Sequence, residues 1–406
     1  MCGIYGHFNP GGADSALIER MAFRLAHRGP DGSGAYHSGA LAFGAGRLAI
    51  IDLTAGVQPI FNETSTVAVV FNGEIYNYQP LRAELERAGH TFTTNTDTEV
   101  IVHGYEQWGI GVLEHLRGMF ALGIWDEPRQ QLLLSRDRLG EKPLYYTALA
   151  HGEFLFASEA KALFEHPGVR RAVNDTALPC FLLLGYVPPP QTLFAGIEKL
   201  APGEYLIVNR DGLRRALYWQ PVMDAAHAPD YPEAVRMVRQ ALTEAVEMQM
   251  MSDVPIGAFL SGGVDSTTIV ALMQQVSSHP VQTFTVGFEA SPGSKEDTKF
   301  NVDSRYAELA VRRLGTYHHT ITMRQDERLC ELLPHLIYAT DEPMSMPTII
   351  QTAYVSALAR HNGIPVLLTG EAGDELFFGY NHYRTDRVLD RYLRLPAVLR
   401  ERVLTP

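Results

Sequence analysis

Short apolar runs bounded by Gly, Asn or Asp recur through the first 160 residues of the chain, and this pattern is typical of β-strands. The runs are MCGIYGHF, ALAFGAGRLAIID, TVAVVFNGEIY, GMFALGIWD and QLLLSRD. Between them, residues 17–26 and 81–88 have apolar side chains three and four positions apart, which predicts two helices, the second ending at Gly89. Residues 200–219 predict a hairpin that turns at residues 209–212. The pattern therefore indicates an α+β fold for this part of the chain.

The pattern changes after residues 221–232, which are rich in Pro, Ala and Asp. Beyond them, the apolar runs IGAFL, VQTFTVGF, HHTITM and IPVLLTG alternate with stretches that predict helices, at residues 233–250, 265–275, 305–314, 328–339 and 348–361. Strands that alternate with long helices predict an α/β domain with a doubly wound parallel sheet. We therefore expect two domains, residues 1–220 and residues 221–406.

Composition narrows the class of protein. Of the 406 residues, 46% are hydrophobic and 20% are charged, as in globular domains with real cores. A net charge of −12 and the lack of a dense Lys/Arg run argue against a nucleic-acid partner. Three cysteines are too few for a disulfide framework and favour a reducing compartment. The first residues do not resemble a signal peptide, and the longest charge-free stretch, residues 176–197, is interrupted by prolines. We expect a cytoplasmic protein without a membrane partner.

Cys2 is a candidate nucleophile, because removal of the initiator methionine would place a thiol and a free α-amino group on one residue. An ordinary α-amine has a pKa of about 7.7 and a Cys thiol one of about 8.5, so near neutral pH the amine can accept the thiol proton. For an isolated Cys2 the alternative is an ordinary buried residue in a first strand.

Five further positions suit acyl transfer from the amide of an amino acid. Asn72 and Gly73 offer a side-chain amide and a backbone N–H to an oxyanion. Arg47 can bind an α-carboxylate through two hydrogen bonds, and Asp97, helped by Glu74, can pair with an α-ammonium group. Taken one at a time, a plain turn explains Asn72–Gly73 as well, and solvated surface charges explain Arg47 and Asp97 better.

Two glycine-containing turns follow predicted strands of the second domain. SGGVDS, at residues 261–266, precedes a helix, so backbone N–H groups and a helix N-terminus surround an anion site there. It lacks the lysine and the spacing of a Walker loop. Asp265 can bind Mg2+, and the turn TGEAGDE, at residues 369–375, can bring Asp374 opposite it to share a metal between phosphates. The alternatives are a structural turn and a charged surface loop.

The motifs MCGI, HRGPDGSG, GRLAIID, NGEIYN, NTDTEV and SRDRLGEKPLYY together resemble the class II glutamine amidotransferase domain. SGGVDS resembles the pyrophosphate loop of ATP pyrophosphatases. The two halves in this order resemble glutamine-hydrolysing asparagine synthetases over nearly the whole chain. The resemblance implies an N-terminal-nucleophile hydrolase sandwich with αββα layers, followed by an ATP-pyrophosphatase domain.

The same resemblance implies residue roles. Cys2 would attack the glutamine carboxamide, Asn72 and Gly73 would stabilise the oxyanion, and the amino-acid end would be held by Arg47, Glu74 and Asp97. ATP and Mg2+ would serve adenylation of an acceptor carboxylate, of aspartate or a related acid, and ammonia arriving through an internal tunnel would displace AMP. We expect a structural role for His27. The implied ATP-binding residues are Leu260, Ser261, Gly262, Gly263, Asp265, Ser266, Val286, Thr369 and Gly370, with Asp265 and Asp374 as metal ligands; Leu260 and Val286 fit a core position equally well.

The sequence departs from that family in two places. A lysine expected in a later helix has no candidate before Pro406, so the sequence is either a fragment or has an incomplete synthetase half. Residues 341–352 read DEPMSMPTIIQT where aspartate-using relatives resemble DEPFADPSAIPT, and Met346 replaces an acidic residue. Alternatives are therefore a tailoring amidotransferase for a non-aspartate acid, or a glutaminase with a non-catalytic second half. Asn381 and Arg384 are either acceptor contacts or surface residues, and a homodimer stays open.

Overall fold

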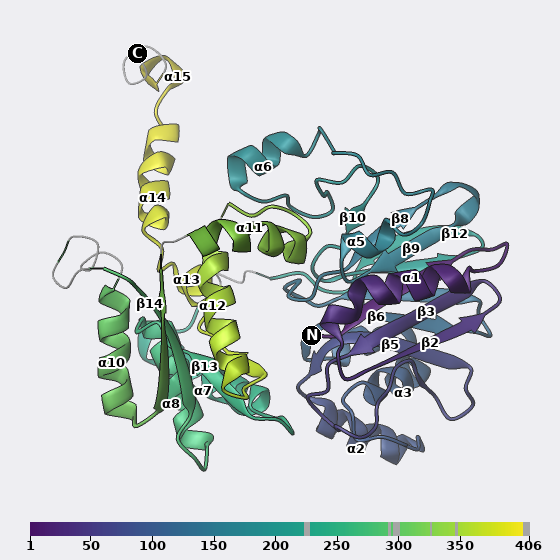
Figure 1. Ribbon diagram of the computed structural model, residues 1–406, viewed down its shortest axis with the longest axis horizontal. Coiled ribbons are helices and arrows are strands. Elements are labelled where there is room, and N and C mark those ends of the chain that lie inside the picture. Colours follow the sequence, from purple (N-terminus) through teal and green to yellow (C-terminus); the bar gives the residue numbers. More distant parts are fainter. Residues whose placement is uncertain (223–227, 291–293, 295–300, 325–326, 346–347, 401–406) are drawn as a thin grey trace. The chain divides into compact units, whose positions relative to one another are not determined.

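A computed structural model describes residues 1–406 except 223–227, 291–293, 295–300, 325–326, 346–347 and 401–406, and the side chains of residues 327, 328, 384, 387 and 398 (Figure 1). The chain divides into two compact units. Unit 1 comprises Met1–Arg236, Met251–Val254 and Asp326–Ile350, and unit 2 comprises Met237–Met250, Pro255–Gln325 and Gln351–Pro406. Each unit is described by itself below.

Unit 1 contains two six-stranded sheets with antiparallel pairing between named strands. The first sheet has the order β10 (Glu198–Lys199), β8 (Tyr145–Ala148), β9 (Phe154–Ala157), β1 (Gly3–Phe8), β3 (Leu41–Arg47) and β2 (Gly32–Ser38). The second has the order β12 (Gly212–Leu217), β11 (Glu204–Asn209), β7 (Gln131–Arg136), β6 (Gly118–Asp126), β5 (Val67–Ile75) and β4 (Ile60–Phe61).

The two sheets share one apolar core. Phe8 of β1 and Trp125 of β6 belong to it, and their rings lie 6.2 Å apart although they come from different sheets. A second cluster packs α1 (Ser15–Leu25) and α5 (Ala160–Leu163) on the first sheet. A third packs α2 (Tyr78–Ala88), α3 (Glu99–Trp108) and α4 (Val112–His115) on the second sheet. The unit thus has the layer order helix, sheet, sheet, helix, and α6 (Leu178–Leu184) and α11 (Glu327–Thr340) belong to it as well (Figure 1).

Unit 2 is built on a parallel four-stranded sheet of order β15, β14, β13, β16. Its strands are β13 (Ile256–Phe259), β14 (Gln282–Phe288), β15 (Tyr317–Met323) and β16 (Val366–Leu368). Its helices are α8 (Val264–Val276), α10 (Val302–Leu314), α13 (Gly373–Phe377), α14 (Asn381–Leu393), α15 (Ala397–Leu399) and the greater part of α7 (Tyr231–Gln249) and α12 (Thr348–His361), whose first turns group with unit 1. Residues of α8 and α10 form one apolar cluster with β13, and residues of α12 form another with β14. From β13, the chain adds β14 and β15 on one side of β13 and then adds β16 on its other side. The direction in which strands are added therefore changes between β13 and β16, and parallel α/β sheets bind ligands at such a point.

Most elements expected from the sequence are present. The α+β part and the parallel α/β part both occur, the hairpin of β11 and β12 turns between Asn209 and Gly212, and α2 ends at Gly89 with a left-handed φ of 106°. The sequence pattern did not predict α3, β2, β8 or β9. None of the helices in the described part of the chain has the length and apolar composition needed to cross a membrane.

Candidate active sites

One cleft of unit 1 collects most of the residues expected around Cys2. Its lining comprises Cys2, Arg47, Leu48, Ile50, Ile51, Gln58, Phe71, Gly73, Glu74, Thr96, Asp97 and Thr98. These residues come from the start of β1, the end of β3 and the loop after it, β5, and the segment before α3. Residues far apart in the sequence are thus brought together by strand pairing and by the packing of α3 on the second sheet.

The Cys2 thiol lies against the backbone that follows β3. Leu48 donates its backbone N–H to Sγ at 3.4 Å, and Sγ donates to the Leu48 carbonyl at 3.8 Å. Burial raises the pKa of this thiol. Arg28 fixes the backbone of the same residue, because its Nε donates to the Cys2 carbonyl at 2.9 Å while its Nη1 donates to Glu159 at 2.7 Å. The thiol is therefore held in place but needs a base to ionise.

The N-terminal amine is also enclosed. Burial lowers the pKa of the Met1 ammonium group to about 6, so most of this amine is neutral at pH 7. Lys142 reaches the Met1 side chain, with Nζ 3.2 Å from Sδ, and burial lowers the pKa of this lysine as well. This pKa belongs to the Met1 amine, and removal of Met1 would leave the α-amine on Cys2 instead.

Asn72 and Gly73 are neighbours on β5, but their placement differs. Gly73 lines the cleft, and a Cβ there would lie 2.1 Å from the Met119 carbonyl oxygen, so only glycine fits. Asn72 is not among the lining residues; its side chain is 1% exposed, and neither amide atom has a hydrogen-bond partner among the described residues. A buried amide without partners is costly, which points to a ligand that satisfies it.

Two carboxylates of the cleft lie side by side. Asp97 accepts from the Ile75 backbone N–H at 2.8 Å and from Thr98 at 3.4 Å. Burial raises the pKa of both Asp97 and Glu74, and the negative charge of Asp97 raises that of Glu74 further. A cation that entered the cleft would favour the ionised form of both groups.

Arg47 also lines the cleft, is 7% exposed and holds the loop that follows it. Its Nη2 donates to the carbonyls of Ile51 and Asp52, at 2.9 and 2.6 Å. The same loop is held from outside by Asp253, which accepts from the Asp52 backbone N–H at 2.8 Å and donates its own N–H to the Ile50 carbonyl at 3.0 Å. Arg47 therefore both lines the cleft and shapes its wall.

In unit 2 the two glycine-containing turns meet at the reversal point of the sheet. Gly263 precedes the first turn of α8, and Gly262 has a left-handed φ of 84°. A Cβ on Gly370 would lie 2.5 Å from the Ser266 backbone nitrogen, and one on Gly373 would lie 2.5 Å from the Asp265 carboxyl carbon. The turn after β16 therefore packs directly on the turn after β13.

Three carboxyl groups lie close together where those turns meet. Burial and the negative charges of Asp374 and Glu375 raise the pKa of Asp265. The hydroxyls of Ser261 and Ser266 lie 2.9 Å apart and hydrogen-bond to each other. Neighbouring carboxylates that repel each other can bind a hard divalent cation such as Mg2+, which neutralises their charge.

The remaining nucleotide candidates take different positions. Leu260 is 1% exposed and belongs to the cluster of α8 and α10, whereas Val286 packs against the cluster of α12. The Thr369 hydroxyl accepts from the Glu371 backbone N–H at 3.5 Å. The structure thus brings Ser261–Ser266 and Gly370–Asp374 together, and it places Leu260 and Val286 in separate apolar clusters.

The segment expected to face the acceptor begins on unit 1. Asp341 accepts from the Ala160 backbone N–H at 2.5 Å and pairs with Lys161 at 2.9 Å. Glu342 accepts from the Leu193 backbone N–H at 2.6 Å and pairs with Lys199. Met346 and the Arg384 side chain lie outside the described residues, Met344 is 46% exposed, and Asn381 begins α14 as an exposed residue.

The sequence did not single out two polar residues that contact the N-terminus: Arg28, which binds the Cys2 carbonyl, and Lys142, which reaches the Met1 side chain. Both lie inside motifs that resemble the amidotransferase domain, HRGPDGSG and SRDRLGEKPLYY, but the motifs alone do not show which of their residues contact the N-terminus. His27 pairs with Glu159 at 3.1 Å and is not among the residues that line the cleft.

Comparisons with known proteins match two parts of the chain to two families. Residues 1–219 match the family described as glutamine amidotransferase domain, and residues 237–405 match asparagine synthase. Over 100% of its length the chain is 37% identical to glutamine-hydrolyzing asparagine synthetase 1 of Bacillus subtilis, of which it covers 63%. It is 36% identical over 98% of its length to a putative glutamine-hydrolyzing asparagine synthetase of Mycobacterium tuberculosis, of which it also covers 63%.

A third relative is covered more completely. The chain is 33% identical over 97% of its length to putative glutamine-hydrolyzing asparagine synthetase 2 of Methanocaldococcus jannaschii and covers 80% of it. Among solved structures, a glutamine phosphoribosylpyrophosphate amidotransferase of Bacillus subtilis matches with a TM-score of 0.42 and 16% identity, over 91% of this chain and 90% of that one. The chain spans 63% of the length of the first two relatives.

Proposed function

We propose that this chain, which belongs to the glutamine-hydrolysing asparagine synthetase family, releases ammonia from glutamine and uses it with ATP to convert a carboxylate into an amide. The family resemblance drawn from the sequence motifs is confirmed by these matches. The observation that carries the proposal is the convergence of Cys2, Gly73 and Asp97 on one cleft, with Arg47 and Glu74 beside them.

We assign residues 1–220 to a glutaminase domain with the N-terminal-nucleophile hydrolase fold and residues 221–406 to an ATP-pyrophosphatase domain. The helix, sheet, sheet, helix layers of unit 1 and the parallel sheet of unit 2 support this assignment. Residues 326–350 group with unit 1 although they follow the nucleotide turn in sequence. The acceptor segment is thereby attached to the glutaminase side through Asp341 and Glu342.

Glutamine hydrolysis begins when Met1 has been removed and the α-amine belongs to Cys2. The amine accepts the thiol proton, and the thiolate attacks the carboxamide carbon. The Asn72 amide and the Gly73 backbone N–H stabilise the oxyanion, which supplies the partner that Asn72 otherwise lacks. The protonated amine then gives its proton to the departing nitrogen, and water hydrolyses the thioester to glutamate.

The amino-acid end of glutamine lies at the opposite wall of the cleft. Arg47 binds the α-carboxylate, and the paired carboxylates of Asp97 and Glu74 bind the α-ammonium group. Bound ammonium charge also lowers the raised pKa values of these carboxyls, so binding and ionisation support each other.

ATP binds at the turns of unit 2 in this proposal, with its phosphates on the backbone of Ser261–Gly263 and at the start of α8. Ser266, Thr369 and Gly370 border the same place in this proposal. Leu260 would contribute from the apolar core, and Val286 from a partly buried position. Adenylation releases pyrophosphate, and ammonia that reaches the adenylate through an internal tunnel displaces AMP.

Asp265 and Asp374 fit Mg2+, because their carboxylates are close enough for the charge of one to raise the pKa of the other. Mg2+ bound there would neutralise charge on the phosphates. Residues Gly373 and Gly370 leave the space in which these carboxylates and the nucleotide approach one another.

The acceptor is aspartate or a related acid. The alternative, a tailoring amidotransferase for another acid, is favoured by the methionines of residues 341–352. A cytoplasmic location, small-molecule partners without nucleic acid, and a homodimer remain predictions. A further alternative is that residues 221–406 are not catalytic and that the protein is a glutaminase alone.

The test is a pair of assays on the full protein. Cys2→Ala should abolish glutamine hydrolysis, while Cys180→Ala, a matched substitution of a cysteine on α6, should leave it unchanged. ATP–pyrophosphate exchange over a panel of acids then identifies the acceptor. ADP and phosphate as products would refute adenylation, and exchange stimulated by aspartate alone would discard the tailoring alternative.

A further inference from the structure

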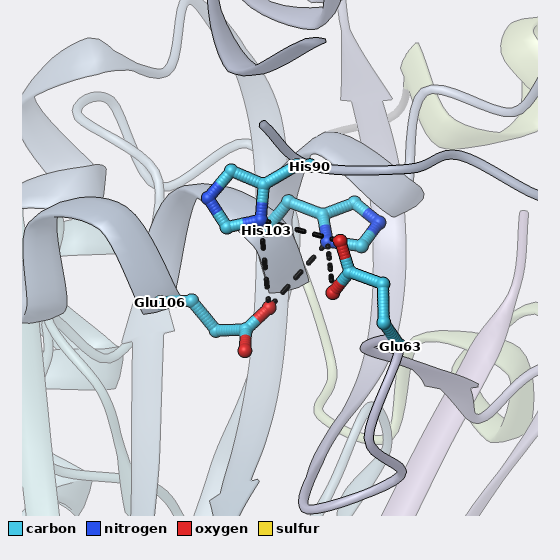
Figure 2. A group of neighbouring side chains, drawn as sticks. All are labelled: Glu63, His90, His103 and Glu106. Atoms are coloured by element: carbon cyan, nitrogen blue, oxygen red, sulfur yellow. Dashed lines mark ion pairs between the residues drawn. The ribbon is translucent and has the colours of Figure 1, made fainter. Parts of the chain in front are cut away.

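Four potential metal ligands converge on unit 1 away from the Cys2 cleft lining: Glu63, His90, His103 and Glu106 (Figure 2). Glu63 lies in the turn between β4 and β5, and His90 follows the end of α2. His103 and Glu106 lie one turn apart on α3. One ligand atom from each residue lies within 4.8 Å of the others.

His103 is the side chain that ordinary packing does not explain. It is 1% exposed, and neither of its ring nitrogens has a hydrogen-bond partner among the described residues. Its Nδ1 faces carboxylate oxygens of Glu63 at 3.3 Å and of Glu106 at 3.5 Å, close but without hydrogen-bond geometry. A buried imidazole nitrogen that faces two carboxylates without bonding to either is suited to a shared central cation.

The separations between histidine nitrogens and carboxylate oxygens in the cluster are close to those between neighbouring ligands of one ion. Zn2+ bonds to His nitrogen and carboxylate oxygen are about 2.0–2.2 Å long, so neighbouring ligands of a tetrahedral ion lie about 3.3–3.6 Å apart. The Nδ1 atom of His90 lies 3.4 Å from Oε1 of Glu63 and 3.8 Å from Oε2 of Glu106. The Nδ1 atom of His103 lies 3.3 Å from the other oxygen of Glu63, Oε2, and 3.5 Å from Oε2 of Glu106. Small side-chain shifts would complete the tetrahedron.

Further polar groups lie behind three of these ligands. Nε2 of His103 faces Glu99 at 3.5 Å, the carboxylate–histidine arrangement common behind metal sites. Glu106 accepts from the Asn62 amide at 2.6 Å, and Glu63 accepts from the Thr91 backbone N–H at 2.8 Å.

A second His/Glu group provides a contrast. In the group of His7, Glu153 and His166, His7 bonds to Glu153 at 2.7 Å through Nε2 and accepts from the Asp14 backbone N–H at 3.1 Å through Nδ1. Both ring nitrogens of His7 are satisfied by protein groups, so that group needs no ion.

We propose that Glu63, His90, His103 and Glu106 bind a divalent transition-metal ion of the zinc class. Two imidazoles favour such an ion over Mg2+ or Ca2+, and two carboxylates balance its charge when both imidazoles are neutral. Glu63 and Glu106 are partly exposed, which gives the ion a path from solvent.

The ion would join three separate segments of unit 1 and hold the chain that leads to Asp97. His90 is a ligand at the start of that chain, and Thr93 and Thr94 donate to Glu99 at 2.7 Å each through their backbone N–H groups. The proposed role is therefore structural, next to the glutamine cleft but without contact with substrate.

The test uses the full chain, stripped with a chelator and then given Zn2+ alone. We expect one zinc ion per chain and a higher thermal midpoint with zinc than without it. The double variant His90→Gln/Glu106→Gln should weaken zinc affinity by about 100-fold or more, since even outer partners contribute about 10–100-fold. The control His279→Gln/Glu84→Gln makes the same chemical change at exposed positions and should keep the zinc.

Two results would overturn the proposal. One is a protein that binds no zinc and has the same thermal midpoint with and without added zinc. The other is zinc that survives in the double variant and is lost in Cys2→Ala, which would place the ion on the thiol. If the double variant does not fold, X-ray absorption of the zinc-loaded wild type decides: nitrogen and oxygen neighbours alone are expected, and a sulfur neighbour contradicts the site.

Discussion

Replacing Asn72 by leucine should separate activity from stability. Both amide atoms of Asn72 are buried and without partners, and each unsatisfied buried polar group costs about 1–3 kcal/mol. Leucine has a similar size, and reshaping a packed site costs about 1–3 kcal/mol. The two atoms together outweigh that cost, so we expect the free energy of unfolding to rise by about 1–3 kcal/mol. Loss of an oxyanion donor should lower kcat for glutamine hydrolysis by about 10²–10³-fold.

The assay pairs glutamine hydrolysis with denaturant unfolding of each variant. Asn62→Leu is the matched control, because Asn62 is also buried but its amide bonds to Glu106 at 2.6 Å and its carbonyl accepts from the Thr66 and Val67 backbone N–H groups. The control should lose stability. The reasoning is refuted if Asn72→Leu loses as much stability as Asn62→Leu, or if its kcat changes by less than about tenfold.

Three further changes test other parts of the account. Burial raises the pKa of Asp97, so kcat/KM for glutamine should fall as the pH drops through that raised value, because the protonated carboxyl no longer binds the ammonium group. The stability of the wild type relative to Asp97→Asn should fall as the pH rises through the same value, because the folded state then carries a buried charge. Glutamine kinetics and unfolding over a pH series measure both effects. Gly373→Ala should abolish ATP–pyrophosphate exchange while glutamine hydrolysis persists, because its Cβ would lie 2.5 Å from the Asp265 carboxyl carbon. Asp253→Ala should raise KM for glutamine several-fold with little change in kcat, because it frees the Asp52 backbone; an unchanged KM would contradict this.

The sequence pattern predicted the two fold types because the strands of both units repeat simple periodicities. The βα alternation from IGAFL to IPVLLTG corresponds to β13–β16, and the apolar runs before residue 160 correspond to β1, β3, β5, β6 and β7. The helix α3 escaped prediction because seven of its ten residues are buried, among them the polar residues Glu99 and His103, so its polar positions do not mark a solvent-exposed face.

The candidate site was predictable only in part, because sequence motifs identify single residues but not residues that packing brings together. Cys2, Gly73 and Asp97 could be named because each belongs to a short string with a chemical meaning. The metal cluster could not, since Glu63, His90 and His103 come from three segments without a common motif. Their proximity depends on the packing of α2 and α3 on the second sheet, which spacing along the chain does not reveal.

The central claim is that the α-amine of Cys2 accepts the proton of its own thiol. Mass spectrometry of the N-terminal peptide, taken from protein whose glutaminase activity has been measured, tests this most directly. The account predicts a peptide that begins at Cys2, with activity in proportion to the processed fraction. Full activity in protein that retains Met1 would contradict it.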